Sequence, residues 1–366
     1  DNMLVNTTGA NNVALGYGAL QVNTTASNNT AVGYLSLFSN TTGHSNVSVG
    51  AYSIYANTQS NRNTALGYNT LSSHNLTSDI NGYNTVVGFQ AGADVTTGVQ
   101  NTFIGGLSGD ANTTASNNTA VGYASLGANT TGTSNTAVGQ GSLQSNTTAS
   151  NNTAVGLDAL VANTTGPFNT AVGVGALGTM TTGQQNTAVG YHAAVVATTG
   201  LYNTAVGLQA ARDLTSGSNN HCFGYRAGDN TSHFHLTTQT GRLIVGNNGT
   251  TNAYVQVAWT VVSDARDKTE VEDIGVGLDL INDLRPVSYK FTDNRENKNP
   301  VGRTKYGFLA QEVLSVEGQN PVIIDDEEEE KLKMTTDNLT AVLVKAVQEL
   351  STQVDELKAE IQELKE

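Results

Sequence analysis

The stretch that decides the fold runs from Asn152 to Phe168 and reads NTAVGLDALVANTTGPF. The pattern recurs along the first part of the chain, with a glycine every seventeen residues and one step of twenty-one. An asparagine stands four residues before each repeat glycine, and Ala, Ser or Thr three residues after it. So regular a period predicts a repeat architecture in which each unit packs on its neighbours. The thirteen repeat glycines are Gly16, Gly33, Gly50, Gly67, Gly88, Gly105, Gly122, Gly139, Gly156, Gly173, Gly190, Gly207 and Gly224.

Each unit combines a short strand with turns. The β-branched stretch Thr170–Val172 ends at Gly173, which can adopt the positive φ of a tight corner. The N-T-T-G and N-T-T-A-S segments are turn formers, and helical repeats are about twice as long. These features predict thirteen coils of a parallel β-solenoid, with a core mainly of Val and Leu and with Ala opposite. Stacking should align the motif asparagines into a ladder of side-chain amides, and the extra residues between Leu71 and Tyr83 should bulge as a loop.

Charge divides the chain near residue 262. Residues 1–262 carry four Arg, no Lys and seven Asp, whereas residues 263–366 carry 13 Lys and Arg against 24 Asp and Glu. The overall net charge of −14 argues against nucleic-acid binding, which needs surplus cations. The single cysteine, Cys222, excludes an intramolecular disulfide, and no apolar run is long enough to predict insertion into a membrane.

The repeats resemble the head repeats of trimeric autotransporter adhesins over about residues 6–228, with NTAVG and NTALG in place of N-S-V-A-I-G blocks. The resemblance implies a β-roll in a homotrimer, and threefold assembly would also give such thin coils a second buried face. Exposed tyrosines directly follow several repeat glycines. They are expected either to form a sugar-stacking stripe or to pack against neighbouring coils or chains: Tyr17, Tyr34, Tyr68, Tyr123 and Tyr191.

Two segments outside the repeats have residues of metal-binding type. Residues 229–262 alternate as a joining β region, and within it His233 and His235 would share one face of a strand. The pair is interpreted as two surface histidines, the alternative being that three chains offer six imidazoles to an axial transition metal. The run Asp325–Glu330 is interpreted as a solvated acidic loop, with calcium binding as the alternative. No cofactor is expected.

From Trp259 to Phe291 the chain reads WTVVSDARDKTEVEDIGVGLDLINDLRPVSYKF. Later blocks are YGFLAQEV, from Tyr306 to Val313, and DNLTAVLVKAVQEL, from Asp337 to Leu350. This part of the chain strongly resembles the intramolecular chaperone domain of phage tailspikes and tail fibres. The resemblance rests on the Ser-Asp and lysine of the first stretch, its L-R-P-V-S-Y and the two later blocks, which occur in this order. The resemblance covers residues 263–366. It implies a domain that guides assembly of a trimeric fibre and then cuts itself off.

Carried onto this sequence, the resemblance makes Ser263 the nucleophile, Lys268 the general base and Val262–Ser263 the scissile bond. Such a hydroxyl needs a neutral amine beside it, and a lysine is neutral only where burial lowers its pKa. Five residues along a helix turn about 140°, so a corner must bring the pair together, and a neighbouring chain could supply the burial. The alternative is an N-cap at Ser263 and Asp264 with a solvated Lys268. Asp264 and Arg266 are expected to be structural partners.

A heptad seam ends the chain, with apolar residues spaced alternately by four and three. Val and Ile at one seam position with Leu at the other favour two strands, whereas the fibre resemblance implies three, which we follow. Packing of this helix on its own domain is the alternative. The seam consists of Leu343, Val347, Leu350, Val354, Leu357, Ile361 and Leu364.

Together these features predict a mainly β chain: a trimeric solenoid shaft over 1–228, a joining region over 229–262, and an α+β self-cleaving chaperone over 263–366 that ends in a long heptad helix. The expected protein is a viral, most simply bacteriophage, tail fibre in the virion, with a host-cell receptor or glycan and an upstream attachment domain as partners. Its only expected bond chemistry is one intramolecular cut. A bacterial trimeric surface adhesin is the alternative. A depolymerase is disfavoured because the seven acidic residues of the repeats are scattered.

Overall fold

The computed structural model describes residues 3–230, 235–250, 253–254, 256, 263–292, 298–318, 321–326 and 332–365. The chain divides into two compact units, residues 1–248 and 249–366.

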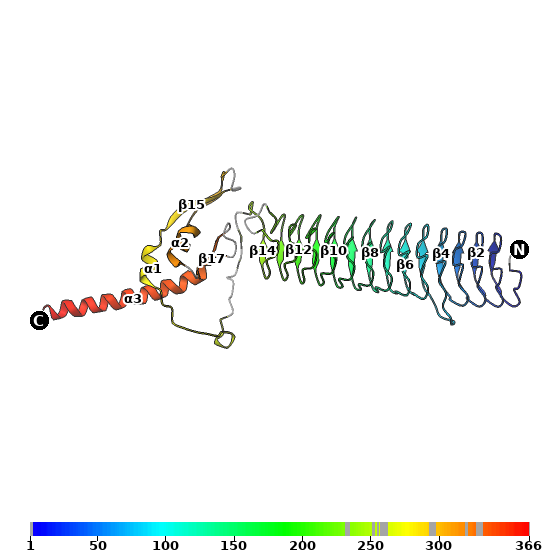
Figure 1. Cartoon of the computed structure of the whole chain (residues 1–366), viewed down its shortest axis with the longest axis horizontal. Coiled ribbons are helices and arrows are strands. Elements are labelled where there is room, and N and C mark those ends of the chain that lie inside the picture. The colour runs from blue at the N-terminus through cyan, green and yellow to red at the C-terminus, as the bar shows by residue number, and fades with distance from the viewer. Residues whose placement is uncertain are drawn as a thin grey trace. The chain divides into compact units, whose positions relative to one another are not determined.

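The first unit is a parallel β-solenoid. Its strands follow one another in sequence order across a single fourteen-stranded sheet, and Figure 1 shows them stacked as successive coils. The strands are β1 Val13–Leu15, β2 Thr30–Val32, β3 Val47–Val49, β4 Thr64–Leu66, β5 Thr85–Val87, β6 Thr102–Ile104, β7 Thr119–Val121, β8 Thr136–Val138, β9 Thr153–Val155, β10 Thr170–Val172, β11 Thr187–Val189, β12 Thr204–Val206, β13 His221–Phe223 and β14 Leu243–Val245.

Each three-residue strand from β2 to β14 buries only its central side chain. In β9, Ala154 is fully buried, whereas Thr153 and Val155 on either side of it are half-buried, because neighbouring strand residues face opposite sides. Leu160, on the following turn, is buried with Ala154 in the same core cluster. The expectation of a core built mainly from Val and Leu is therefore wrong for most valines. The coil is thin enough that Ala usually fills the strand side of the core, and valines other than Val86 and Val95 lie outside the buried core cluster.

The asparagine ladder is present, and its main bonds differ from those expected. At every step the side-chain oxygen of one motif asparagine accepts the backbone N–H of the next, as from Asn152 to Asn135 at 3.0 Å and from Asn169 to Asn152 at 2.8 Å. Direct amide-to-amide bonds occur at some steps, such as Asn203 to Asn186 at 3.0 Å. The ladder thus satisfies buried backbone donors as well as side chains, which ties the seventeen-residue period to the hydrogen bonding of the backbone.

The stack departs from the seventeen-residue period in two places. The inserted residues between β4 and β5 protrude from the coils, with Ser78, Asp79 and Ile80 exposed (Figure 1). The stack also continues beyond residue 228, because β14 pairs in parallel with β13 and aligns Leu243 with His221. Part of the segment expected to join the domains is therefore a fourteenth strand of the solenoid.

A histidine occupies a core position in the coil that carries the insertion. His74 is fully buried and lies one coil beyond Asn57, where the repeat carries an asparagine whose amide bonds to Asn40. Its ring Nε2 lies 3.0 Å from the Ser60 hydroxyl. Burial lowers the pKa of His74 from 6.5 to about 4. The fold therefore disfavours the charged form of this histidine.

We expect His74 to make the solenoid acid-sensitive. Its pKa is lower in the folded chain than in the unfolded one, so its contribution to stability is present above pH 6.5 and is lost as the pH falls from 6.5 towards 4. The loss amounts to about 3 kcal/mol. His74→Asn should reduce the decrease in melting temperature between pH 7 and pH 4.5, whereas His44→Asn, at a partly exposed position, should not. Equal acid sensitivity of the parent and His74→Asn in circular-dichroism melts would contradict this.

The second unit combines short helices, two hairpins and one long helix. Its described core is small and consists of Val313, Ile323, Ile324, Leu339 and Val342. The hairpins are antiparallel and pair β15 with β16 and β17 with β18. The elements are the 3-10 helix η1 Ala265–Asp267, α1 Leu278–Asp283, β15 Val287–Thr292, β16 Pro300–Gly307, α2 Ala310–Glu317, β17 Ile324–Asp325, β18 Lys333–Met334 and α3 Thr336–Glu363. The predicted α+β region that ends in a long helix is confirmed.

Candidate functional site

A tight corner brings Ser263 and Lys268 together. Asp264 caps η1, since its carboxylate accepts the backbone N–H of Arg266 at 2.9 Å. The Arg266 guanidinium also pairs with that carboxylate at 2.6 Å. The chain then reverses over one 3-10 turn, and Lys268 Nζ donates a hydrogen bond to Ser263 Oγ at 2.7 Å. A corner, rather than one helix, thus places the amine on the hydroxyl.

The charges around this corner favour one fixed arrangement. Hydrogen bonds from Arg266 lower the pKa of Asp264 below its usual value, so this carboxylate stays ionised and paired. Asp264 is therefore occupied by the cap and by Arg266, which leaves Lys268 to Ser263. Ser263 and Lys268 are both exposed in the single chain. The predicted scissile residue, Val262, lies outside the described residues.

The segment around Ser263 has features of both interpretations, the helix cap and the serine–lysine pair. An aspartate caps the helix, as the structural alternative required, although Asp264 alone accepts the capping bond and Ser263 does not. At the same time Lys268 is directed onto Ser263 instead of extending freely into solvent. The cap and the serine–lysine contact are compatible, because the cap forms the corner that closes the contact.

Two glutamates that the sequence did not single out organise the second unit. The Glu349 carboxylate of α3 accepts the N–H of Leu278 at 2.7 Å, and so caps α1, whose own N-cap residue, Gly277, has no side chain. The Glu317 carboxylate accepts the backbone N–H groups of three successive residues, Val322 to Ile324, at 2.7 to 3.0 Å. The glycine before α1 was the only sequence signal of a missing cap, and nothing local identified its partner.

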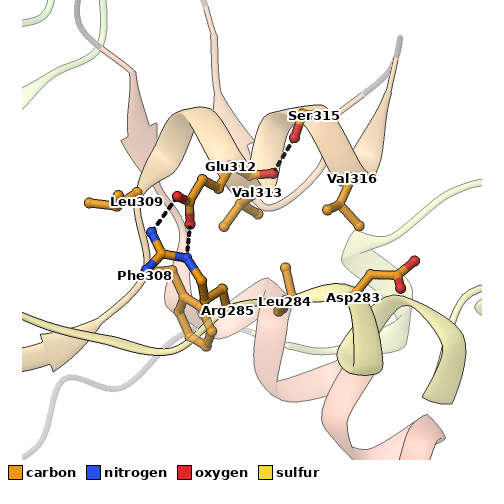
Figure 2. A pocket seen from close by; sticks show the side chains of 9 residues that line it. All are labelled: Asp283, Leu284, Arg285, Phe308, Leu309, Glu312, Val313, Ser315 and Val316. Carbon is orange, nitrogen blue, oxygen red and sulfur yellow. Dashed lines mark hydrogen bonds and ion pairs between the residues drawn. The ribbon is translucent and has the colours of Figure 1, made fainter.

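Two of the motif blocks meet around a pocket of about 220 Å³. Figure 2 shows Arg285, from L-R-P-V-S-Y, facing Glu312, from YGFLAQEV, beside Leu284 and Val313. The Arg285 guanidinium donates to both carboxylate oxygens of Glu312, one of them at 3.1 Å. Because this ion pair is largely exposed, solvent screens it and it contributes little to stability. We assign it to holding α2 against the segment after α1.

The heptad seam of α3 is exposed in the single chain. Near its start the helix buries Leu339, Val342 and Ala346 in its own unit. All seven seam residues that follow, from Leu343 to Leu364, are 41–86% exposed. The alternative, in which the helix packs on its own domain, holds for the first turns of α3 and not for the seam.

A second unpartnered apolar surface runs along the solenoid. The third residue of every strand is apolar and is half-buried or exposed, and the strand register aligns these residues in one line, which we call the strand stripe. It consists of Leu15, Val32, Val49, Leu66, Val87, Ile104, Val121, Val138, Val155, Val172, Val189, Val206, Phe223 and Val245. The coil core does not use this face, so the stripe is available to another chain.

The predicted metal sites receive little support from the described residues. His233 lies outside them, and the His235 ring is 3.7 Å from the Asp213 carboxylate. Of the acidic run, Asp325 lies 3.5 Å from the Lys333 amine, and residues 327–330 are outside the described part. Among the residues that the structure describes, no three His, Cys, Asp or Glu side chains form a group that could hold a metal ion.

Two acidic residues of the solenoid that are separated in the sequence are neighbours in the fold. Asp94 and Asp110 lie on adjacent coils, where the Asp94 backbone N–H donates to the Asp110 carbonyl at 3.0 Å. Burial, and then repulsion from Asp94, raises the pKa of Asp110. Folding therefore creates a carboxylate pair that the sequence argument against a depolymerase had not counted.

In the described helices, no segment is long and apolar enough to cross a membrane.

Comparison with known proteins identifies the second unit. Residues 263–322 match the family model described as chaperone of endosialidase. The matched range includes Ser263, Lys268 and the blocks that meet at Arg285 and Glu312, and it confirms that the C-terminal part of the chain carries a chaperone domain of this family. No curated protein and no solved structure matches the chain. A β-solenoid shaft followed by such a domain fits a tail-fibre-like or tailspike-like protein.

Proposed function

We propose that this protein is the receptor-binding shaft of a bacteriophage tail fibre, a homotrimer whose C-terminal domain guides assembly and then cuts the chain at Val262–Ser263. The observation that carries the proposal is the 2.7 Å contact between Lys268 Nζ and Ser263 Oγ. It lies at the first residues of the matched chaperone region, where a cut would separate the chaperone from the shaft.

The proposed reaction uses only the chain and water. A neutral Lys268 amine takes the proton of the Ser263 hydroxyl, and Oγ attacks the carbonyl carbon of Val262. The Val262–Ser263 C–N bond breaks, and the protonated lysine returns its proton to the departing amine of Ser263. This leaves an ester between Val262 and Ser263 Oγ. Water hydrolyses the ester, which releases the Val262 carboxylate and regenerates the serine hydroxyl.

Assembly would complete this site. Ser263 and Lys268 are exposed in one chain, and water around an amine favours its charged form, which cannot act as a base. A neighbouring chain that covered the corner would exclude water and favour the neutral amine. Cutting would then follow assembly, because the base becomes active only when the chains have met.

Two surfaces support several copies of the chain. The strand stripe and the α3 seam are both apolar and continuous, the seam is exposed and the stripe is half-buried or exposed, and they belong to different units. Removing such surfaces from water is the usual driving force for association. A closed threefold arrangement covers both without leaving an open end that would add further chains.

We expect charges on the seam to dissociate the assembly. In Leu350→Lys with Leu357→Lys, two ammonium groups would have to enter the apolar contact, so the native mass should fall from three chains towards one. Thr352→Lys with Ala359→Lys adds the same charges on the opposite face of α3 and should keep the parent mass. Light scattering or native mass spectrometry of the full chain measures both. An unchanged mass in the seam variant, or a parent of one chain, would overturn the proposed assembly.

A further inference from the structure

A row of aromatic rings crosses the first coils of the solenoid. We call it the aromatic ladder, and consecutive rings in it have centroids 5.4 to 6.1 Å apart. Its outward rings remain accessible, with exposures of 46 to 64% for those that directly follow a corner glycine. Phe38 and Tyr55 stack on each other beside it, and Tyr55 also contacts Tyr52 of the ladder. The ladder consists of Tyr17, Tyr34, Tyr52, Tyr68 and Phe89.

The repeat itself does not require these rings. Four ladder residues directly follow a corner glycine, and at this position other coils carry Ala51, Gly106, Gln140 and Val174 without interruption of the sheet. Single tyrosines also occur there later in the chain. The coil can therefore form without aromatic rings at this position, and the run of rings in mutual contact is a feature of the solenoid surface.

The extent of the ladder separates it from the surfaces that would join the chains. The strand stripe continues through all fourteen strands, as a contact between parallel shafts requires. The ladder covers only the coils from Tyr17 to Phe89. A neighbouring shaft alongside would meet every coil alike, so an aromatic row confined to one part of the stack fits a ligand better than a second copy.

The surrounding charges restrict the ligand further. From Tyr17 to Phe89 the only Asp, Glu, Lys or Arg residues are Arg62 and Asp79. Stacked nucleobases would bring phosphates that need several cations, and acidic polysaccharides would need them as well. A neutral ligand made of successive flat rings does not. Tyrosine suits such a ligand, since it presents an apolar ring face together with a hydroxyl for hydrogen bonding.

We propose that the aromatic ladder binds a neutral glycan chain that extends across the coils, with successive sugar rings stacked on successive aromatic rings. The inference rests on the proposed receptor-binding function and deepens it, because it assigns the class of receptor and its place on the shaft. Tyr34 and Tyr68 would be central contacts. Loss of both contacts should weaken binding about tenfold or more.

The test uses the full chain and a panel of neutral oligosaccharides of glucose, mannose and N-acetylglucosamine, with hyaluronan as an acidic control. We expect at least one neutral member to bind in calorimetry and hyaluronan not to bind. Tyr34→Ala with Tyr68→Ala should raise the Kd of the neutral oligosaccharide that binds about tenfold or more. The fold should tolerate this change, because Ala51 occupies the same repeat position. Tyr191→Ala with Tyr225→Ala, at that position outside the ladder, should leave Kd unchanged.

Three results would overturn the inference: no neutral member of the panel binds, the ladder variant binds as tightly as the parent, or the ladder variant loses its native mass. The last would make the ladder a contact between chains. Native mass and the release of residues 263–366 are measured on the same preparation. If those two fail while glycan binding persists, the proposed fibre function is wrong and the ladder site stands. If glycan binding fails while the native mass and the release of residues 263–366 are as expected, the ladder site is wrong and the proposed fibre function stands.

Discussion

Ser263→Ala is expected to leave the chain intact, whereas the parent separates into the shaft and a fragment of residues 263–366. Without the hydroxyl there is no nucleophile at the Val262 carbonyl, so the rate of cutting should fall on the order of a thousandfold or more. A denaturing gel and intact mass of freshly purified protein measure the fragment. The native assembly of Ser263→Ala should contain the same number of chains as that of the parent, because assembly precedes the cut.

Replacement of Lys268 tests the base separately. Lys268→Met removes the amine, and Lys268→Arg keeps a charge that cannot be lost near neutral pH, so both should remain uncut. Lys290→Met is the control, since it removes an exposed lysine of β15 and leaves the Ser263–Lys268 contact, and it should still cut. Cutting in Lys268→Arg would exclude this lysine as the base. Cutting of the dissociated seam variant at the parent rate would refute the coupling to assembly.

Gly105→Ala is expected to destabilise the solenoid severely, by about 3 kcal/mol or more. Gly105 has φ of +139°, which residues with a side chain rarely adopt, and a Cβ there would lie 2.3 Å from the carbonyl oxygen of Gly122 in the next coil. Since the coils on either side make the same approach, at Gly88 and Gly122, neither coil can move away without disturbing the next. The substitution therefore breaks the stacking that the period depends on.

Gly106→Ala is the matched control one residue further on. A Cβ there has no neighbour closer than 3.6 Å and the backbone needs no positive φ, so the change in the free energy of unfolding should stay within about 1 kcal/mol. Chemical denaturation of both variants, each combined with Ser263→Ala so that all chains keep one length, gives the comparison. Equal stability of the two variants would show that the corner does not constrain the coil.

Much of the solenoid could be predicted because its information is local and repeated. The glycine and asparagine positions fixed the period, the insertion before Tyr83 predicted the protruding loop, and both are present. The outward orientation of Val155 was missed, since a three-residue strand leaves two of its side chains outside and one inside. His74 was missed for a similar reason: its burial follows only from its position one coil beyond Asn57, where the repeat carries a buried asparagine.

The sequence by itself determined the repeat, the corner glycines, the charge boundary near residue 262 and the resemblance of the C-terminal part, because each depends on residues close together in the chain or on a fixed period. Only the tertiary structure decided which apolar residues face outward, that Asp94 and Asp110 become neighbours, and that Glu349 caps α1 from α3. Tyr17 through Phe89 likewise became a row of rings only once the coils were stacked. The physical reason is the same throughout: these contacts join different coils or different helices, and the side chains that make them meet only when the backbone of both partners is in place.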